Sequence, residues 1–379
     1  MIIAQRKSVF LHSPELEKFS YPEQSPFKTN RAALTRNTVF SMGLLSGDGR
    51  SEQPPVSATR LELEQFHKPC YLDAIVAAEK GHLTHQAFAM GLGTPDCPVF
   101  RGMYEYVCLA SGASITGARL ILSGKADIAF NPSGGYHHAF PDRAAGFCYI
   151  NDIVLAALTL TKAGRRVAFV DLDVHHSDGV QAAFYDRSDV MTISMHEDGR
   201  NLFPGTGFED ETGNGPGKGY CVNVPLPVGT YDAAYKLAFD EAVMPLLKAY
   251  NPDVIMLELG MDTLAGDPLA HLHLTNNVYA DIVSDVMALN RPILATGGGG
   301  YNVDNTVRAW SLIWSVLCGE QTEDLSIGMG GVMLQSTEWA GGLRDRVLLT
   351  DAGRRGMIEH EIRQTIGKLH SSVFPIHGL

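Results

Sequence analysis

Apolar residues in the second half of the chain recur in two alternating patterns, one typical of buried strands and one typical of amphipathic helices. Short apolar runs predict strands at 127–130, 167–170, 190–195, 254–259 and 292–295. Longer stretches with helical spacing predict helices at 112–122, 150–163, 232–250, 277–290 and 305–318. This alternation indicates an α/β fold in which helices flank a mostly parallel central sheet.

The two ends of the chain lack this regular alternation. Residues 13–60 are rich in Pro, Ser, Asn and Arg with weak periodicity, so we expect irregular rim loops packed on a core. Residues 320–379 follow the last predicted helix as a C-terminal extension. Because there is no internal repeat and no low-complexity linker, we expect residues 1–379 to form a single domain.

Composition narrows the class of protein. Hydrophobic residues make up 45% of the chain, charged residues make up 19%, and no apolar run reaches the roughly 18 residues of a membrane span. The apolar part of residues 1–7 is too short for a signal peptide, and the six cysteines form no CxxC pair, so we expect a cytoplasmic protein with no membrane association. The formal net charge of -12 disfavours direct nucleic acid binding and favours cationic substrates.

Polar and glycine-rich clusters follow four of the predicted strands. They occupy residues 131–138, 171–178, 260–263 and 297–301. Ligands of open parallel sheets bind beyond the carboxyl ends of the strands. We therefore expect these four clusters to line one site.

The cluster after residue 170 has the composition of a metal site. Asp173 and His175 lie two residues apart, which places both side chains on one face of an extended chain. Asp262, from a separate strand, would complete a three-ligand set with a position open for water and substrate. Such ligands suit Zn²⁺, but Fe²⁺ and Mn²⁺ would also accept them. An acidic loop that caps a helix is the simpler alternative.

Three further side chains would complete a hydrolytic site. The adjacent His137 and His138 can face one site if Gly134 and Gly135 allow a tight turn, and Asp171 and Asp178 are available to orient the two rings. A His–Asp pair can take a proton from metal-bound water. Tyr301, after four glycines, could donate its hydroxyl to a developing oxyanion. This set predicts hydrolysis of an amide.

These motifs resemble those of the zinc-dependent histone deacetylase superfamily, most closely class I histone deacetylases and bacterial acetoin-utilisation deacetylases. The resemblance covers about residues 60–318 and rests on the segments 132–139, 146–152, 171–179, 203–207, 260–268 and 297–301. It implies an arginase/deacetylase-like fold and one catalytic Zn²⁺ bound by Asp173, His175 and Asp262. It also implies that Tyr301 polarises the acyl carbonyl.

The resemblance assigns different roles to the two histidines. His138, paired with Asp178, would be the general base and then the general acid, whereas His137, paired with Asp171, would act electrostatically. A structural K⁺ near the zinc cluster is implied as well. Ser177 replaces the family's usual glycine in the His-His-Gly-Asp pattern.

The resemblance also implies a narrow tunnel for an acylated lysine of a protein or peptide. Its walls would be Gly146, Phe147, Phe203 and Leu269, although the two phenylalanines alone would be typical of an ordinary core. The family's acidic rim residue, which clamps the substrate backbone, has no match in residues 79–93. An acetylpolyamine amidohydrolase is therefore the alternative, since the net charge favours cationic amines.

Two other classes of protein fit the sequence less well. A binuclear manganese ureohydrolase of the arginase type needs acids for a second metal, but Ser177, Gly260 and Leu264 occupy the neighbouring positions. A binding protein that had lost catalysis would lack a metal ligand or Tyr301, and all are present.

Overall fold

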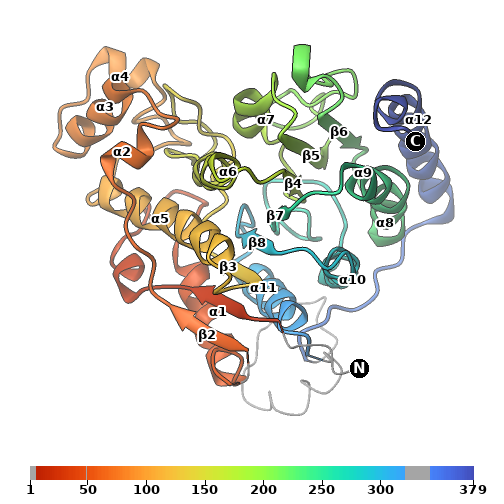
Figure 1. The fold of residues 1–379 in the computed structure, drawn as a ribbon, viewed down its shortest axis with the longest axis horizontal. Coiled ribbons are helices and arrows are strands. Elements are labelled where there is room, and N and C mark those ends of the chain that lie inside the picture. The colour runs from red at the N-terminus through yellow and green to blue at the C-terminus, as the bar shows by residue number, and fades with distance from the viewer. Residues whose placement is uncertain (1–5, 48, 321–341) are drawn as a thin grey trace.

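The computed structural model describes residues 6–47, 49–320 and 342–379. Eight strands of this described part form one sheet in the order β2-β1-β3-β8-β7-β4-β5-β6, and every neighbouring pair is parallel (Figure 1). The strands are β1 (Ser8–Leu11), β2 (Arg50–Gln53), β3 (Ile128–Asn131), β4 (Val167–Asp171), β5 (Val190–Glu197), β6 (Cys221–Leu226), β7 (Val254–Glu258) and β8 (Ile293–Thr296). The expected α/β class with a parallel central sheet is confirmed.

Helices cover both faces of the sheet. One face packs against α5 (Met103–Leu122), α6 (Asp152–Lys162) and α7 (Asp178–Phe184). The other face packs against α1 (Asn30–Ser41), α8 (Asp232–Ala238), α9 (Met244–Tyr250), α10 (Asn276–Ala288), α11 (Val303–Leu317) and α12 (Ala352–Ser372). Because both faces are buried, the strands β3, β8, β7 and β4 are apolar up to their last residue rather than alternating, and β4 reads Val-Ala-Phe-Val before Asp171.

A third hydrophobic cluster lies beside the loops that follow β3. It includes residues of α2 (Arg60–Leu63), α3 (Pro69–Glu79) and α4 (His85–Ala89), together with Tyr136 and Tyr149. In Figure 1 these short helices lie at the upper left, next to the amino-terminal part of α5. They support the loop that carries two of the candidate site residues.

The expectation of irregular structure at 13–60 is wrong in part. This region contains α1 and the edge strand β2, and β1 precedes it. The sequence of β2 is Arg-Ser-Glu-Gln, which shows no apolar pattern, and the strand is half-buried throughout. It exists because its backbone pairs with β1, in the register Ser8 to Arg50, and backbone pairing leaves no trace in the side-chain pattern.

The predicted helices are present, with different boundaries in two places. The helix expected at 112–122 begins earlier, at Met103. The helix expected at 232–250 is divided into α8 and α9 by a π-helical turn at Phe239–Val243. Pro245 lies just after this turn, and a proline cannot donate the hydrogen bond of a regular helix interior, which accounts for the interruption.

The C-terminal extension expected at 320–379 is part of the folded domain where the structure describes it. Residues 321–341 lie outside the described residues. Beyond them, α12 packs against α8 and β6. Asp345 forms a buried ion pair with Arg308 of α11 and accepts a hydrogen bond from the Asn276 backbone of α10 at 2.9 Å.

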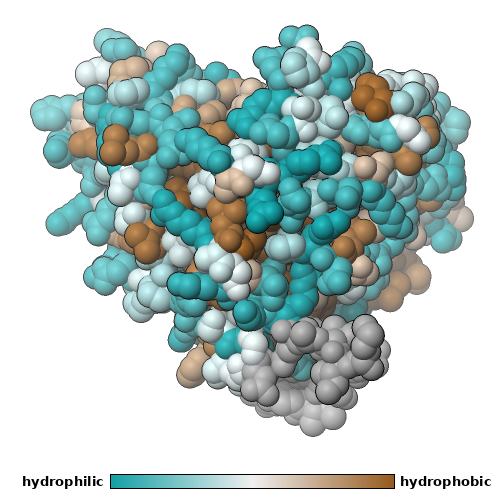
Figure 2. Space-filling view, viewed as in Figure 1, coloured by the Kyte–Doolittle hydropathy of each residue, from teal (hydrophilic) through white to brown (hydrophobic). Residues whose placement is uncertain are grey.

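The surface seen in Figure 2 is mostly hydrophilic, with hydrophobic residues in small separate groups. No helix within the described ranges is both long and apolar enough to cross a membrane.

Candidate functional site

The four polar clusters follow four strands that lie side by side in the middle of the sheet, β3, β8, β7 and β4. Their ends are level, because Phe130 and Leu257 both pair with Ala295, and Asp171 pairs with Glu258. The carboxyl ends of these parallel strands therefore open on one place, as expected from the sequence.

His137 and His138 form a buried pair, and each ring is held by its own acid. The Nδ1 atom of His137 lies 2.8 Å from Asp171 Oδ2, and the Nδ1 atom of His138 lies 2.7 Å from Asp178 Oδ1. The two Nε2 atoms face each other at 2.9 Å. The acids thus leave the Nε2 edges of both rings directed into the site.

The turn before the two histidines depends on a close approach of backbone segments. Gly135 has a φ of 99°, and a Cβ atom there would lie 2.4 Å from the carbonyl oxygen of Gly297. The buried carboxylate of Asp152 accepts hydrogen bonds from the backbone of Gly135 and Tyr136, at 3.1 and 2.8 Å. Asp152, to which the sequence assigned no role, therefore holds the histidine loop against the glycine-rich turn after β8.

The three expected metal ligands converge. His175 Nδ1 lies 3.0 Å from Asp173 Oδ1 and 3.2 Å from Asp262 Oδ2, and one ligand atom from each residue lies within 4.8 Å of the others. All three are buried, and Asp262 Oδ2 has no hydrogen-bond partner in the described part of the chain. A buried carboxylate oxygen without a donor favours a cation, so this donor set fits Zn²⁺.

Two glycines make room for these carboxylates. A Cβ atom on Gly260 would lie 1.9 Å from Asp173 Oδ2, and one on Gly299 would lie 1.9 Å from Asp262 Oδ2. The Gly299 backbone N–H also donates to Asp173 Oδ2 at 2.7 Å. The glycine runs therefore let the backbone approach the candidate ligands and orient them.

Burial and neighbouring charges shift the pKa values of the two histidines in opposite directions. Burial alone would lower the pKa of His137, but the negative charges of Glu258 and Asp171 raise it well above its ordinary value. Burial and the neighbouring His137 lower the pKa of His138 to about 4, despite its pairing with Asp178. These shifts favour the neutral form of His138 and the charged form of His137.

Tyr301 is positioned by its backbone and by its ring. Its N–H donates to Asp267 Oδ2 at 2.7 Å, and its ring centroid lies 5.6 Å from that of Phe147. Arg31, buried beneath the turn, donates to the carbonyl oxygens of Gly298 and Gly300. Burial, together with the charges of nearby acids, raises the pKa of Tyr301 well above its ordinary value, so its hydroxyl remains a donor.

The candidate tunnel residues lie around this group. The Phe203 ring stands edge-on to His138, with centroids 5.0 Å apart, and the residue is 47% exposed, which contradicts an ordinary core role. A Cβ atom on Gly146 would lie 2.4 Å from the His138 ring and 3.0 Å from Phe203, so glycine is required there. Leu269 donates its backbone N–H to Asp267 Oδ1 at 2.9 Å, and Asp267 thereby links Leu269 to Tyr301.

The serine that departs from the family pattern fits its place. Ser177 is buried and has φ -76°, a backbone conformation that requires no glycine.

Sequence reasoning missed two acids near this site. Asp96 lies three residues after the segment 79–93, in which no rim acid is found. Its carboxylate accepts a hydrogen bond from the Gly146 N–H and its carbonyl oxygen accepts one from the Phe147 N–H, both at 3.1 Å. Glu258, at the end of β7, is fully buried beside His137 and Asp171. Its signal was an acid within an otherwise apolar strand.

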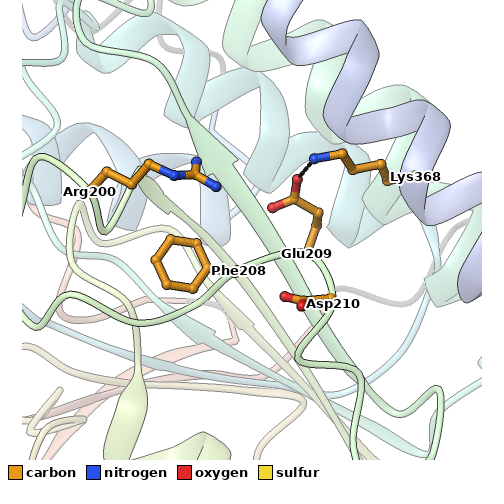
Figure 3. A pocket seen from close by; sticks show the side chains of 5 residues that line it. All are labelled: Arg200, Phe208, Glu209, Asp210 and Lys368. Atoms are coloured by element: carbon orange, nitrogen blue, oxygen red, sulfur yellow. Dashed lines mark hydrogen bonds and ion pairs between the residues drawn. The ribbon is translucent and has the colours of Figure 1, made fainter.

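An open surface cavity of about 400 Å³ lies elsewhere and contains none of these residues. Figure 3 shows its lining, Arg200, Phe208, Glu209, Asp210 and Lys368. Its two cations already have partners, since Lys368 pairs with Glu209 and Arg200 pairs with Asp198. Because its lining contains none of the candidate residues, the cavity is distinct from the candidate site.

Comparison with known proteins agrees with this geometry. Residues 25–317 match the sequence model of the histone deacetylase domain. The chain is 39% identical to the acetoin utilization protein AcuC of Bacillus subtilis, over 83% of each chain, and 37% identical to histone deacetylase clr6 of Schizosaccharomyces pombe, over 86% of this chain and 80% of that one. It is 38% identical to histone deacetylase 3 of rice (Oryza sativa subsp. japonica) over 84% of this chain, but covers only 63% of the rice protein.

Solved structures give the same result. The crystal structure of a histone deacetylase homologue from Aquifex aeolicus superposes with a TM-score of 0.83 at 30% identity, over 96% of this chain and 99% of that chain. A histone deacetylase homologue in complex with SAHA superposes with the same TM-score, identity and coverage.

Proposed function

Because this chain belongs to the histone deacetylase family, we propose that it is a zinc-dependent amidohydrolase that removes acetyl or other acyl groups from the side-chain amine of lysine. The observation that carries this proposal is the arrangement of two His–Asp pairs beside three converging buried ligands.

In this proposal Asp173, His175 and Asp262 hold one Zn²⁺. The metal, when bound, lowers the pKa of water and polarises a carbonyl oxygen. Its site requires deprotonated carboxylates. Burial and the charge of Asp173 raise the pKa of Asp262 to about 7 in the metal-free protein, so metal binding would compete with protons there.

The remaining chemistry belongs to side chains of the chain itself. Neutral His138, oriented by Asp178, takes a proton from the attacking water and then gives it to the nitrogen of the leaving amine as the C–N bond breaks. Positively charged His137 stabilises the negative charge that develops on the acyl group. Tyr301 donates its hydroxyl to the carbonyl oxygen as that oxygen becomes an oxyanion.

The substrate stem would pass between aromatic side chains. Phe147 packs against Tyr301, Phe203 packs against His138, and Gly146 lies close to both the His138 and the Phe203 ring. Burial of a methylene stem contributes about 0.8 kcal/mol per CH₂. A straight acylated primary amine would suit a narrow channel between these rings. Asp96, which accepts hydrogen bonds from the backbone of Gly146 and Phe147, is the candidate for the rim acid that would bind a peptide backbone.

Metal analysis combined with activity tests the proposal. The purified protein should contain about one zinc per chain, and Asp173→Ala and Asp262→Ala should lose zinc and activity together. About two metals per chain, with Mn²⁺ restoring the best activity, would instead support a binuclear hydrolase.

An acylated polyamine is the alternative substrate, and the net charge of -12 favours it. A panel of acyl-lysine peptides, capped acyl-lysine and acetylpolyamines should separate the two. We expect capped acyl-lysine to be hydrolysed within about tenfold of the kcat/KM of longer peptides, a difference of about 1.4 kcal/mol. A preference for acetylpolyamines above about 10³-fold, or about 4 kcal/mol, would favour the alternative.

That the protein binds a structural K⁺ and that it is cytoplasmic remain predictions from the sequence.

A further inference from the structure

Glu258 is a third carboxyl group at the base of the histidine pair. It is the last residue of β7, is fully buried, and lies opposite Asp171 in the pairing of β7 with β4. Its Oε2 atom lies 3.1 Å from His137 Nδ1, the same nitrogen that lies 2.8 Å from Asp171 Oδ2. His137 therefore faces two carboxyl groups, whereas His138 faces one.

Burial of a carboxyl group at position 258 carries a free-energy cost. The Nδ1–H bond of His137 is directed at Asp171, so neither oxygen of Glu258 has a hydrogen-bond donor among the residues that the structure describes. A Cβ atom on Gly298 would lie 2.9 Å from Oε1, so the neighbouring turn encloses the carboxyl group closely. Burial and the charge of Asp171 raise the pKa of Glu258 well above its ordinary value. Packing alone would not select an acid here, since an apolar residue of similar size would avoid the cost.

We propose that Glu258 is a positioning residue for His137: its carboxyl oxygen, 3.1 Å from Nδ1 and beside Asp171, attracts the N–H group electrostatically and so limits rotation of the ring. The inference rests on the proposed function, because the ring of His137 contributes to catalysis only through its place next to His138. A residue that orients a catalytic imidazole is expected to affect turnover without changing substrate binding.

Two substitutions separate this role from simple packing. Glu258→Gln keeps an oxygen at the same distance along the side chain, whereas Glu258→Met keeps the length and removes every acceptor. Glu197→Gln is the matched control, because Glu197 is a buried glutamate at the end of β5 whose carboxylate bonds to His271 instead.

The experiment measures kcat, KM, zinc content and the imidazole N–H resonance of His137 in zinc-loaded protein with ¹⁵N-labelled histidine. His137→Asn identifies the resonance by its loss. We expect Glu258→Met to move the resonance upfield and to lower kcat about tenfold, with KM and zinc content unchanged. Glu258→Gln should move it less and keep kcat within about threefold, and Glu197→Gln should change neither.

The inference is overturned if Glu258→Met leaves both the resonance and kcat as in the wild type, or if Glu258→Gln loses as much activity as Glu258→Met. If Glu258→Met does not fold, the test rests on the His137 N–H resonance of Glu258→Gln. A resonance at the same position as in the wild type would then overturn the inference. A wild-type protein that hydrolyses no acylated amine, with a moved resonance in Glu258→Met, would refute the proposed function and support the positioning role.

Discussion

At the scale of single residues, the sequence motifs predicted which catalytic side chains lie together, but not which neighbouring residues hold them in place. His137, His138, Asp171 and Asp178 pair as expected, because residues at level strand ends must converge. Glu258 and Asp96 were missed, since their importance depends on neighbours that are distant in the sequence. Nothing in the local pattern indicates that an acid in an apolar strand faces a histidine of another loop.

Tyr301→Phe tests the proposed oxyanion donor. The substitution removes only a hydroxyl, and the ring can still pack against Phe147, so zinc content and melting temperature should not change. Turnover should fall about 10²-fold or more. Tyr106→Phe is a matched control, because the hydroxyl of Tyr106 bonds to Tyr136 outside the site. An unchanged kcat in Tyr301→Phe would show that the hydroxyl does not act in the transition state.

His138→Ala tests the proton carrier. Because His138 is proposed to move a proton and not to bind metal, the variant should keep its zinc while kcat falls about 10²-fold or more. Asp178→Asn should give a smaller loss, since the ring is still present and only its orienting acid has changed. Loss of zinc from His138→Ala would mean that His138 is a ligand and that the assigned roles are wrong.

At the scale of elements, the sequence predicted the five adjacent strands in the middle of the sheet, β3, β8, β7, β4 and β5. It missed β1, β2 and β6 at the two edges of the sheet, although β1 and β6 are buried. β4 and β7 are recognisable because a short, mostly apolar run is typical of a strand covered on both faces. β2 is a polar edge strand, so its pairing with β1 leaves no pattern to read. Helix boundaries moved where packing, as at the beginning of α5, or a proline, as at the beginning of α9, overrode periodicity.

The turn after β8 needs a glycine at position 299, and Gly299→Ala tests this requirement. The added methyl group would lie 1.9 Å from Asp262 Oδ2, so the carboxylate must move and zinc affinity should fall about tenfold or more. Gly356→Ala in α12 is the control, because it meets no atom within 4 Å and should stabilise the helix by about 0.5–1 kcal/mol. Equal zinc affinity in Gly299→Ala and wild type, measured by competition with a chelator, would contradict the tight fit.

His67 should make the fold sensitive to acid. Its Nε2 atom accepts from the Asn151 backbone N–H at 3.0 Å, just before α6, and burial lowers the pKa of His67 to about 3. The unfolded chain, with a pKa near 6.5, then binds more protons than the folded one, so the stabilising contribution is full above pH 6.5 and is lost as the pH falls towards 3. Between pH 7 and pH 5 the loss from this residue is about 2 kcal/mol.

Urea unfolding of wild type and His67→Gln at both pH values measures this contribution. The fall in unfolding free energy from pH 7 to pH 5 should be smaller in His67→Gln by about that amount, although the variant itself is less stable at pH 7. The same fall in both proteins would show that His67 does not titrate on unfolding.

At the scale of the whole molecule, we expect charge to act on the approach of a substrate and the proposed channel to act on its fit, and the two effects can be separated. A net charge of -12 attracts cations over a distance comparable to the Debye length, which is about 10 Å at 0.1 M salt. Burial of a methylene stem between Phe147 and Phe203 depends little on salt, because it is a transfer of apolar surface from water.

The salt dependence of kcat/KM therefore shows which effect decides substrate choice. For an acetylpolyamine, which retains positive charge outside the channel, we expect kcat/KM to fall about fivefold between 0.02 and 0.5 M salt. For a neutral capped acetyl-lysine with the same acyl group, the change should be less than about twofold, since only apolar burial and the chemistry of the site contribute. An equal response of both substrates would mean that the long-range field does not select cations, and the charge argument for polyamines would then have no support.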